Sequence, residues 1–262
     1  KTLTSHPVSV NIKHDWINNG TFLHNSGTVN FNGTAQQDIS GETTFHNLTI
    51  NNASGVLAED NITVNAMLNL ASENASSTVG ALDMKPVYTG DVLSSSNTLY
   101  MGAHATTIGV GDVTGRIVRD TIAADVEYTF GNANTSIRFY DGASLPTQLK
   151  IIPRIGICHA TKSNTLQRTY QIVRTGGSTP TKFSLKLSYL TSELNGANEN
   201  NLVFWDHHIP YAGTSPHEHG KTELNTSGNT ITLSGHGIRY LAQNEYFGEL
   251  AYVDDITTPP SQ

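Results

Sequence analysis

The sequence predicts an all-β protein in which a short β-solenoid, similar to a parallel β-helix, precedes an antiparallel β-sandwich. Apolar residues alternate with polar ones over short stretches, as at Val29 with Phe31 and at Leu48 with Ile50. This is the pattern of strands with one buried face. Asn-Gly and Ser-Gly pairs, which favour turns, interrupt these stretches every few residues. Because the stretches are short and strictly alternating, we expect strands with almost no helix.

The solenoid pattern covers residues 16–115. Between Trp16 and Leu70 the strands are so short that their apolar residues must be buried against the next coil of the same chain. Fourteen of the first hundred residues are Asn, so stacked coils can also form hydrogen-bonded ladders of Asn side chains. The pattern weakens in the polar segment ASENASSTVG after Leu70 and resumes up to Gly115, where we place the boundary.

Residues 1–15 contain one further strand pattern. Val8, Val10 and Ile12 alternate with polar residues, while Pro7 removes a backbone donor and disfavours a place in the centre of a sheet. The segment can cap the first coil of its own solenoid, because an open end exposes unpaired strand edges. It can equally form an inter-subunit strand that pairs with another copy of the chain.

Residues 116–262 have longer apolar stretches at wider spacing. Nine segments are expected to form strands: GRIVRD, VEYTFG, SIRFYD, QLKIIPRIGICHA, QRTYQIVRTGG, TKFSLKLSYL, NLVFWDHH, NTITLSG and YFGELAYVDD. Many antiparallel strands separated by turn signals are typical of a β-sandwich. In the sixth segment, Phe183, Leu185 and Leu187 fall on one face and Lys and Ser residues on the other, which indicates a half-buried strand.

Both halves resemble parts of large bacterial proteins. NNGTF, GTVNFNGTAQQDISG and TFHNLTINNASGV resemble the Asn/Gly/Thr-rich solenoid segments of secreted and cell-surface, adhesin-like proteins of Gram-negative bacteria of the Bacteroidetes type. GRIVRDTIAADVEYTFGN and LKLSYLTSELNGANENNLVFWD resemble the sandwich module that often follows such a segment. The resemblance implies a structural or adhesive protein outside the cell. Lys1 as the first residue fits either a mature protein whose signal was removed or an excised fragment.

The chain departs from that resemblance after Asp206, in the His-rich loop HHIPYAGTSPHEHGKTE. His217 and His219 are two residues apart, so on an extended segment both imidazoles project to one side and can share a structural divalent metal. Asp206, His207 and His208 can complete the metal shell, as can Glu218. A solvated loop and a protein contact are the alternatives. We expect no other cofactor.

Composition and charge exclude several classes of protein. The formal net charge of −7 and the sequence pI of about 5.8 argue against a nucleic-acid partner, which normally binds a basic patch. No stretch approaches the roughly 18 apolar residues of a membrane span. The single cysteine, Cys158, excludes an intramolecular disulfide and lies in an apolar run where we expect it to be buried.

Catalysis is not expected, although related solenoids host polysaccharide-active enzymes. Such sites need clustered carboxylates, often with Arg or Lys, on adjacent coils. Between Trp16 and Leu70 there is no Lys or Arg, and the acids are Asp38, Glu42, Glu59 and Asp60. We therefore interpret the chain as a non-enzymatic protein and keep a polysaccharide-active enzyme as the third alternative.

The sequence favours an extracellular structural protein of a bacterial cell surface that associates with other copies of itself into a filament or surface layer. The second interpretation is an adhesion module that binds surface glycans, with Trp205 and Tyr211 stacking on sugar rings. For the solenoid we expect Leu48→Asp to destabilise the protein far more than Asn52→Asp, because a charge without a partner cannot be buried between coils at small cost.

Overall fold

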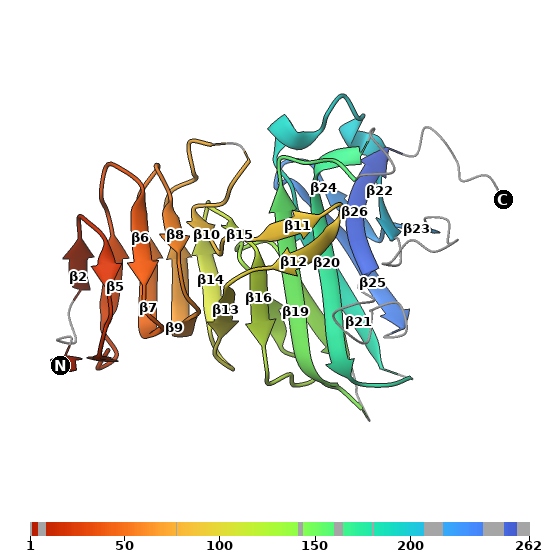
Figure 1. The fold of residues 1–262 in the computed structure, drawn as a ribbon. Coiled ribbons are helices and arrows are strands. Elements are labelled where there is room, and N and C mark those ends of the chain that lie inside the picture. The colour runs from red at the N-terminus through yellow and green to blue at the C-terminus, as the bar shows by residue number, and fades with distance from the viewer. Residues whose placement is uncertain are drawn as a thin grey trace. The chain divides into compact units, whose positions relative to one another are not determined.

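The computed structural model describes residues 2–4, 9–76, 78–140, 144–159, 165–179, 181–206, 217–237 and 249–255, with the backbone alone at 217 and 249–255. It has 57% strand and 3% helix, which confirms the all-β prediction. In the part of the chain that the structure describes, the helical segments are the short 3₁₀ turns η1 (Thr191–Glu193) and η2 (Glu199–Asn201). The chain folds into two compact units (Figure 1). Unit 1 is residues 1–89, 93–120 and 130–133, and unit 2 is residues 90–92, 121–129 and 134–262.

Unit 1 is a β-solenoid of about six turns, as the sequence predicts. Each turn passes along three faces. The first face contains β1 (Thr2–Thr4), β4 (Thr21–Leu23), the first halves of β7 (Thr43–Ile50) and β9 (Ile62–Leu70), β13 (Thr98–Met101) and β16 (Arg116–Arg119). The second contains β2 (Ser9–Ile12), β5 (Thr28–Phe31), the second halves of β7 and β9, and β14 (Thr106–Gly109). The third contains β3 (Trp16–Ile17), β6 (Gln37–Ser40), β8 (Val56–Ala58), β10 (Leu82–Asp83) and β15 (Val113–Thr114).

Neighbouring strands on each face pair in parallel, and β2, β5, β7 and β9 lie side by side in Figure 1. Thr28 pairs with Ser9 and with Asn47, nineteen residues away on each side. The parallel stacking continues through β16, which pairs with β13, so the solenoid extends past the expected boundary at Gly115.

The alternation of apolar and polar residues builds the core of unit 1. On the second face, Val29 and Phe31 stack on Leu48 and Ile50, and all four are buried. Burying one such side chain stabilises the fold by about 1.5–3 kcal/mol. The outward Asn30 between them donates to Asn11 Oδ1 at 2.8 Å, so the predicted Asn ladder forms between the first two turns.

Aromatic side chains fill the core of the first turns. The Trp16 and Phe22 rings meet edge to face with centroids 4.9 Å apart, and Phe45 lies 5.7 Å from Trp16. The indole Nε1 donates to Thr43 Oγ1 at 3.2 Å, so the ring buries its apolar body and keeps a polar partner.

Neutral amides bridge the corner between the second and third faces. Asn52 is 1% exposed, and its Nδ2 donates to Ala35 O and to Gln37 Oε1. Gln37 Nε2 in turn donates to Ile12 O and His14 O. Asn52→Asp, which we expect to be milder than Leu48→Asp, should therefore still destabilise the protein, because a carboxylate would lose both donated hydrogen bonds and face two acceptor oxygens.

Two longer connections explain why the solenoid pattern weakens after Leu70. Residues 71–81 join β9 to β10, and residues 84–97 join β10 to β13 and contain the hairpin of β11 (Val87–Thr89) and β12 (Val92–Ser95). Both leave at corners of the coil. They interrupt the sequence pattern while β9, β10 and β13 keep the parallel stacking.

Unit 2 contains two antiparallel sheets, as predicted for the second half. One has the order β19 (Pro146–Ile155), β20 (Thr165–Gly176), β26 (Glu249–Asp255), β22 (Leu202–Asp206) and β23 (His217–Gly220). The other has the order β17 (Glu127–Thr129), β18 (Ser136–Tyr140), β21 (Lys182–Ser188), β25 (Thr230–Gly237) and β24 (Glu223–Asn225). The nine predicted segments all contain strands, although the first, β16, belongs to the solenoid; β23 and β24 were not predicted.

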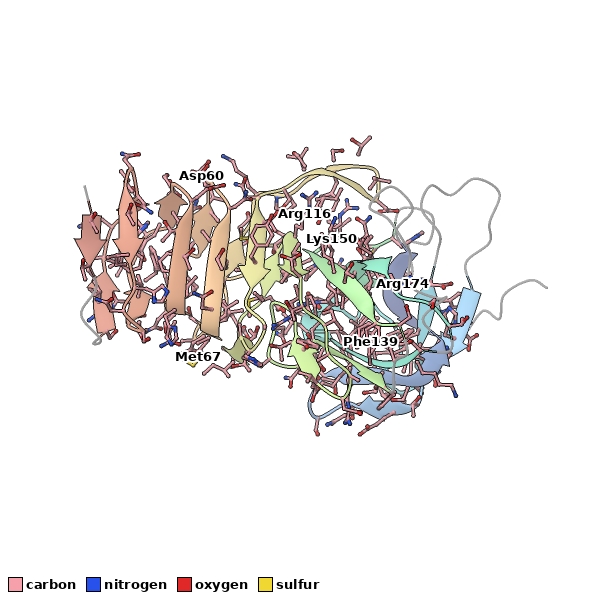
Figure 2. The ribbon with its side chains drawn as sticks, turned by 90° about the horizontal axis from the view of Figure 1, so that it is seen from below. Asp60, Met67, Arg116, Phe139, Lys150 and Arg174 are labelled. Atoms are coloured by element: carbon pink, nitrogen blue, oxygen red, sulfur yellow. The ribbon has the colours of Figure 1, made fainter. Side chains whose placement is uncertain are left out.

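The two sheets of unit 2 pack face to face through mixed apolar and polar contacts. Within the second sheet, Phe139 on β18 is buried beside its cross-strand partner Phe183 on β21, with ring centroids 6.4 Å apart, and Figure 2 shows Phe139 among the side chains inside this unit. Tyr170 on β20 donates its hydroxyl proton to Ser188 O at 2.7 Å across the sheets. Cys158 is only partly buried, which differs from the expectation, and its Sγ accepts from Asn195 Nδ2.

Buried ion pairs also lie inside unit 2. Arg168 on β20 makes two hydrogen bonds to the Glu193 carboxylate, at 2.8 and 3.0 Å, and both side chains are buried. Arg154 on β19 pairs with the buried Asp91 at 2.8 Å, and His159 Nε2 lies 4.0 Å from the same carboxylate.

Candidate functional site

The first turn of unit 1 presents an open end. Within the described residues, β1, β2 and β3 are each the outermost strand of their sheet. Edge strands carry backbone groups that can pair with a further strand. The same end exposes apolar side chains, with Leu3 57% and Ile17 69% accessible, and Val10 and Leu23 exposed as well. An exposed apolar group beside open strand edges is a surface suited to protein contact.

A hollow of about 530 Å³ lies at this end. Its lining comes from β1, β3 and the start of β4, and includes Leu3, Asp15, Trp16, Ile17 and Asn18. Asp15 accepts from the backbone N–H of Asp38, and Asn18 donates to Thr43 Oγ1. The polar groups at the hollow are thus held by the second and third turns, which fixes its shape.

The last turn of unit 1 is closed in a different way. Arg119 on β16 is buried, and its guanidinium donates to Gly102 O at 2.9 Å and to Ala105 O at 2.7 Å. Its charge also lies over the Phe130 ring, 5.3 Å from the centroid, in a cation–π contact. The core at this end therefore finishes on a buried charged side chain that bonds to two backbone oxygens, whereas the first turn ends on exposed apolar side chains.

The proposed inter-subunit strand falls on this first turn. Val8 lies outside the described residues, while Val10 and Ile12 are in β2, opposite Val29 and Phe31 of β5. The segment thus forms the first turn of its own solenoid. Because β5 covers one edge of β2, pairing with another copy could use only the outer edge.

The second candidate site is a carboxylate with two imidazoles in unit 2. Asp206 ends β22, and His219 lies in the partner strand β23, with Nε2 at 2.8 Å from Asp206 Oδ2. His236, near the end of β25 in the other sheet, packs edge to face against His219 with ring centroids 5.5 Å apart. Burial lowers the pKa of His236, as does the neighbouring His219, while Asp206 opposes them. We call these three residues the Asp206 cluster.

The structure does not describe the side chains of three expected metal ligands. His207 and His208 lie outside the described residues, and only the backbone of His217 is described, opposite Asp206 in the strand pair. Where side chains are described, no three His, Cys, Asp or Glu groups are already arranged to hold a metal ion. His236 was missed by the sequence analysis, since it lies 17 residues beyond His219 and no local motif links the two.

The aromatic residues expected to stack on sugars do not form an exposed platform. Trp205 is 3% exposed, because it belongs to the buried strand β22, so its ring cannot take part in surface stacking. The prediction for Trp205 is therefore wrong. Tyr211 lies outside the described residues.

A second, more polar hollow of about 300 Å³ lies on the third face of unit 1. Residues of the 71–81 connection and of β8 and β10 line it, including Ser54, Asn74, Ser76 and Asp83. Burial raises the pKa of Asp83, while the Lys85 backbone N–H and the Lys85 charge act in the opposite direction. Glu59 and Asp60 are engaged nearby in structural contacts, with Lys85 and with the Gly41 N–H respectively, and Asp60 is labelled in Figure 2.

Comparisons with known proteins give no relative for this chain. No protein-family model, no curated protein and no solved structure matches it. Among the residues that the structure describes, no helix is both long and apolar enough to cross a membrane.

Proposed function

We propose that this protein is an extracellular structural component of a bacterial cell surface that associates with a second copy of itself through the first turn of unit 1. The observation that supports the proposal is the combination of open strand edges with exposed Leu3, Val10, Ile17 and Leu23 at one end of the solenoid. A surface of this kind is stabilised when another strand pairs with it and its apolar side chains are covered.

The partner we propose is a second copy in a two-fold arrangement. Two identical first turns can meet so that the β2 edges pair antiparallel, with the exposed apolar side chains of each copy against those of the other. Contacts between like surfaces close on themselves and give a pair rather than an open chain. A filament or layer would then need a further contact elsewhere on each copy.

Light scattering after size-exclusion chromatography tests the proposal. We expect the wild-type chain to dimerise with rising concentration and the Leu3→Lys/Ile17→Lys variant to remain monomeric, because like charges would face each other across the contact. Both side chains are exposed in the single copy, so the variant should fold normally. Val110→Lys is the matched control, since Val110 is also an exposed apolar residue of unit 1.

A wild-type chain that stays monomeric at its highest soluble concentration would contradict the self-association. A dimer that survives in the double variant would locate the contact elsewhere.

The cellular location is tested separately. Antibodies against the protein should label intact, unpermeabilised cells of the source organism, and labelling only after permeabilisation would contradict a surface location.

Glycan binding is the second candidate function, favoured by the polar hollow beside Asp83. Its volume lies at the lower end of the range of about 300–1,000 Å³ that ligand pockets occupy. Its hydroxyl, amide and carboxyl groups suit the hydroxyls of a saccharide. Calorimetric titration with saccharides should give binding that Asp83→Ala weakens and Asp38→Ala does not. Absence of binding across a broad glycan set would exclude this candidate.

A further inference from the structure

The Asp206 cluster brings together three of the groups that ligate transition metals, from three strands and both sheets of unit 2. Asp206 and His219 come from the paired strands β22 and β23, and His236 comes from β25. Imidazole and carboxylate are ligands that late first-row divalent ions accept. We propose that Asp206, His219 and His236 bind such an ion, of the type Zn²⁺, Cu²⁺ or Ni²⁺.

The distance between the first two donors suits a shared ion. Asp206 Oδ2 and His219 Nε2 are 2.8 Å apart. Ligand atoms about 2.0–2.1 Å from one ion are separated by roughly this distance when the ligand–metal–ligand angle is near a right angle. An ion can thus bridge these two atoms with little movement of either strand.

The third donor is within reach by rotation of a side chain. A ligating imidazole nitrogen lies about 2.1 Å from zinc, which puts the ring centre roughly 3.2 Å from the ion. Two rings with centres 5.5 Å apart can therefore share one ion at an angle of roughly 120°. The ring planes are 88° apart, and rotation about the side-chain bonds of His236 can direct one of its nitrogens to the ion.

Binding of the ion to His219 requires that the ligating nitrogen carry no proton. A neutral His219 with its proton on Nε2 shifts that proton to Nδ1 by exchange with water, which frees Nε2 for the ion. A protonated imidazole instead releases one proton to solvent. The Asp206 carboxylate ligates as an anion, and the remaining positions of the ion are taken by water or by further side chains.

Ligation would connect the two sheets of unit 2 at one edge. Asp206 and His219 belong to one sheet and His236 to the other. An ion that binds the folded unit and not the unfolded chain raises its stability, and with it the melting temperature, by mass action. The proposal does not depend on self-association.

The experiment uses the full chain after treatment with chelator. Trp205 adjoins Asp206 in sequence, so in a Trp16→Phe background its fluorescence should be quenched when Cu²⁺ or Ni²⁺ binds. Titration with each ion gives the affinity, and melting with Zn²⁺ gives the thermal shift. We expect His219→Gln/His236→Gln to weaken binding roughly tenfold or more and to remove the shift.

His24→Gln/His46→Gln is the matched control. These two histidines form the stacked pair of unit 1, with ring centroids 5.4 Å apart, and their loss should leave the affinity unchanged. Copper electron paramagnetic resonance should report two nitrogen ligands in the wild type and fewer in His236→Gln. Full affinity in His219→Gln/His236→Gln, or loss of binding only when His207 and His208 are replaced, would overturn the proposal.

Discussion

The two units satisfy their buried polar groups in different ways. In unit 1 the amides of Gln37 and Asn52 bond to backbone oxygens and to each other. In unit 2 the charged side chains of Arg168 on β20 and Glu193 in η1 are buried against one another. Burying an amide costs little free energy when the amide is hydrogen-bonded. Burying an ion costs much more hydration free energy, and this cost is offset only while its charged partner is present. The difference shows that this corner of the coil is filled by uncharged amides that bond to one another, whereas the ion pair of unit 2 depends on the presence of both charged partners.

The largest expected effect is on the ion pair of unit 2. Glu193→Ala should destabilise unit 2 by about 3–5 kcal/mol, because it leaves the Arg168 guanidinium buried without its carboxylate. Glu193 also accepts from the Leu190 N–H at 2.8 Å, and that bond is lost too. Urea unfolding followed by Trp205 fluorescence measures the change. The exposed Glu223→Ala is the control, and an equal effect of both variants would contradict the account.

The next effect tests the amide network of unit 1. Asn52→Asp should cost about 3 kcal/mol, because it removes two donated hydrogen bonds and places a carboxylate beside Ala35 O and Gln37 Oε1. Lowering the pH towards the carboxyl pKa should restore part of the loss, since the protonated acid can donate again. The measurement is urea unfolding followed by Trp16 fluorescence in a Trp205→Phe background. If Asn52→Asp left the free energy of unfolding unchanged, this corner of unit 1 would tolerate a buried charge as unit 2 does.

A smaller effect concerns pH and His24. Burial lowers the pKa of His24, and the stacked His46 lowers it further. The folded protein therefore binds fewer protons than the unfolded chain as the pH falls through 6.5, so stability is lost from about pH 7 down to the folded pKa. His24 also contacts Asn65 and the Ser26 N–H. His24→Gln should flatten the dependence of the urea midpoint of unit 1 on pH, and an unchanged slope would exclude His24 as its source.

The smallest effect tests the exposed part of the Asn ladder. Asn30→Ala removes the donor to Asn11 in a solvent-exposed position, so we expect a loss of only about 0.5–1 kcal/mol in the same unfolding assay. Asn47→Ala serves as a comparison, since its bond to Thr28 Oγ1 is longer at 3.4 Å. If Asn30→Ala lowered the free energy of unfolding as much as Asn52→Asp does, solvent exposure would not explain the difference between exposed and buried amides.

The local pattern of the sequence predicted the strands, because alternation reports directly which side of a strand is buried. Phe31, Ile50 and Leu187 are buried as expected. The regular spacing of unit 1 was also visible, since SVNIK, TVNFN and NLTIN recur nineteen residues apart. This repeat by itself fixes the stacking register of the first three turns.

Contacts between residues far apart in the sequence could not be read in this way. Arg154 and Asp91 are 63 residues apart, and nothing in either local sequence selects the other. Corner residues such as Asn52 escape the alternation rule, because a residue between two strands can point into the core or away from it. Trp205 was misread because an aromatic residue before a polar loop gives the same pattern whether its strand is central or exposed.

The connections at the corners of unit 1 have a practical consequence for protein engineering. Residues 71–81 leave the coil after β9 and return at β10, yet both strands keep the parallel register of the turns around them. The entropy cost of closing a loop grows only slowly with its length. This corner is therefore a suitable place to graft a foreign peptide, such as an epitope or an affinity tag, for display on a rigid scaffold.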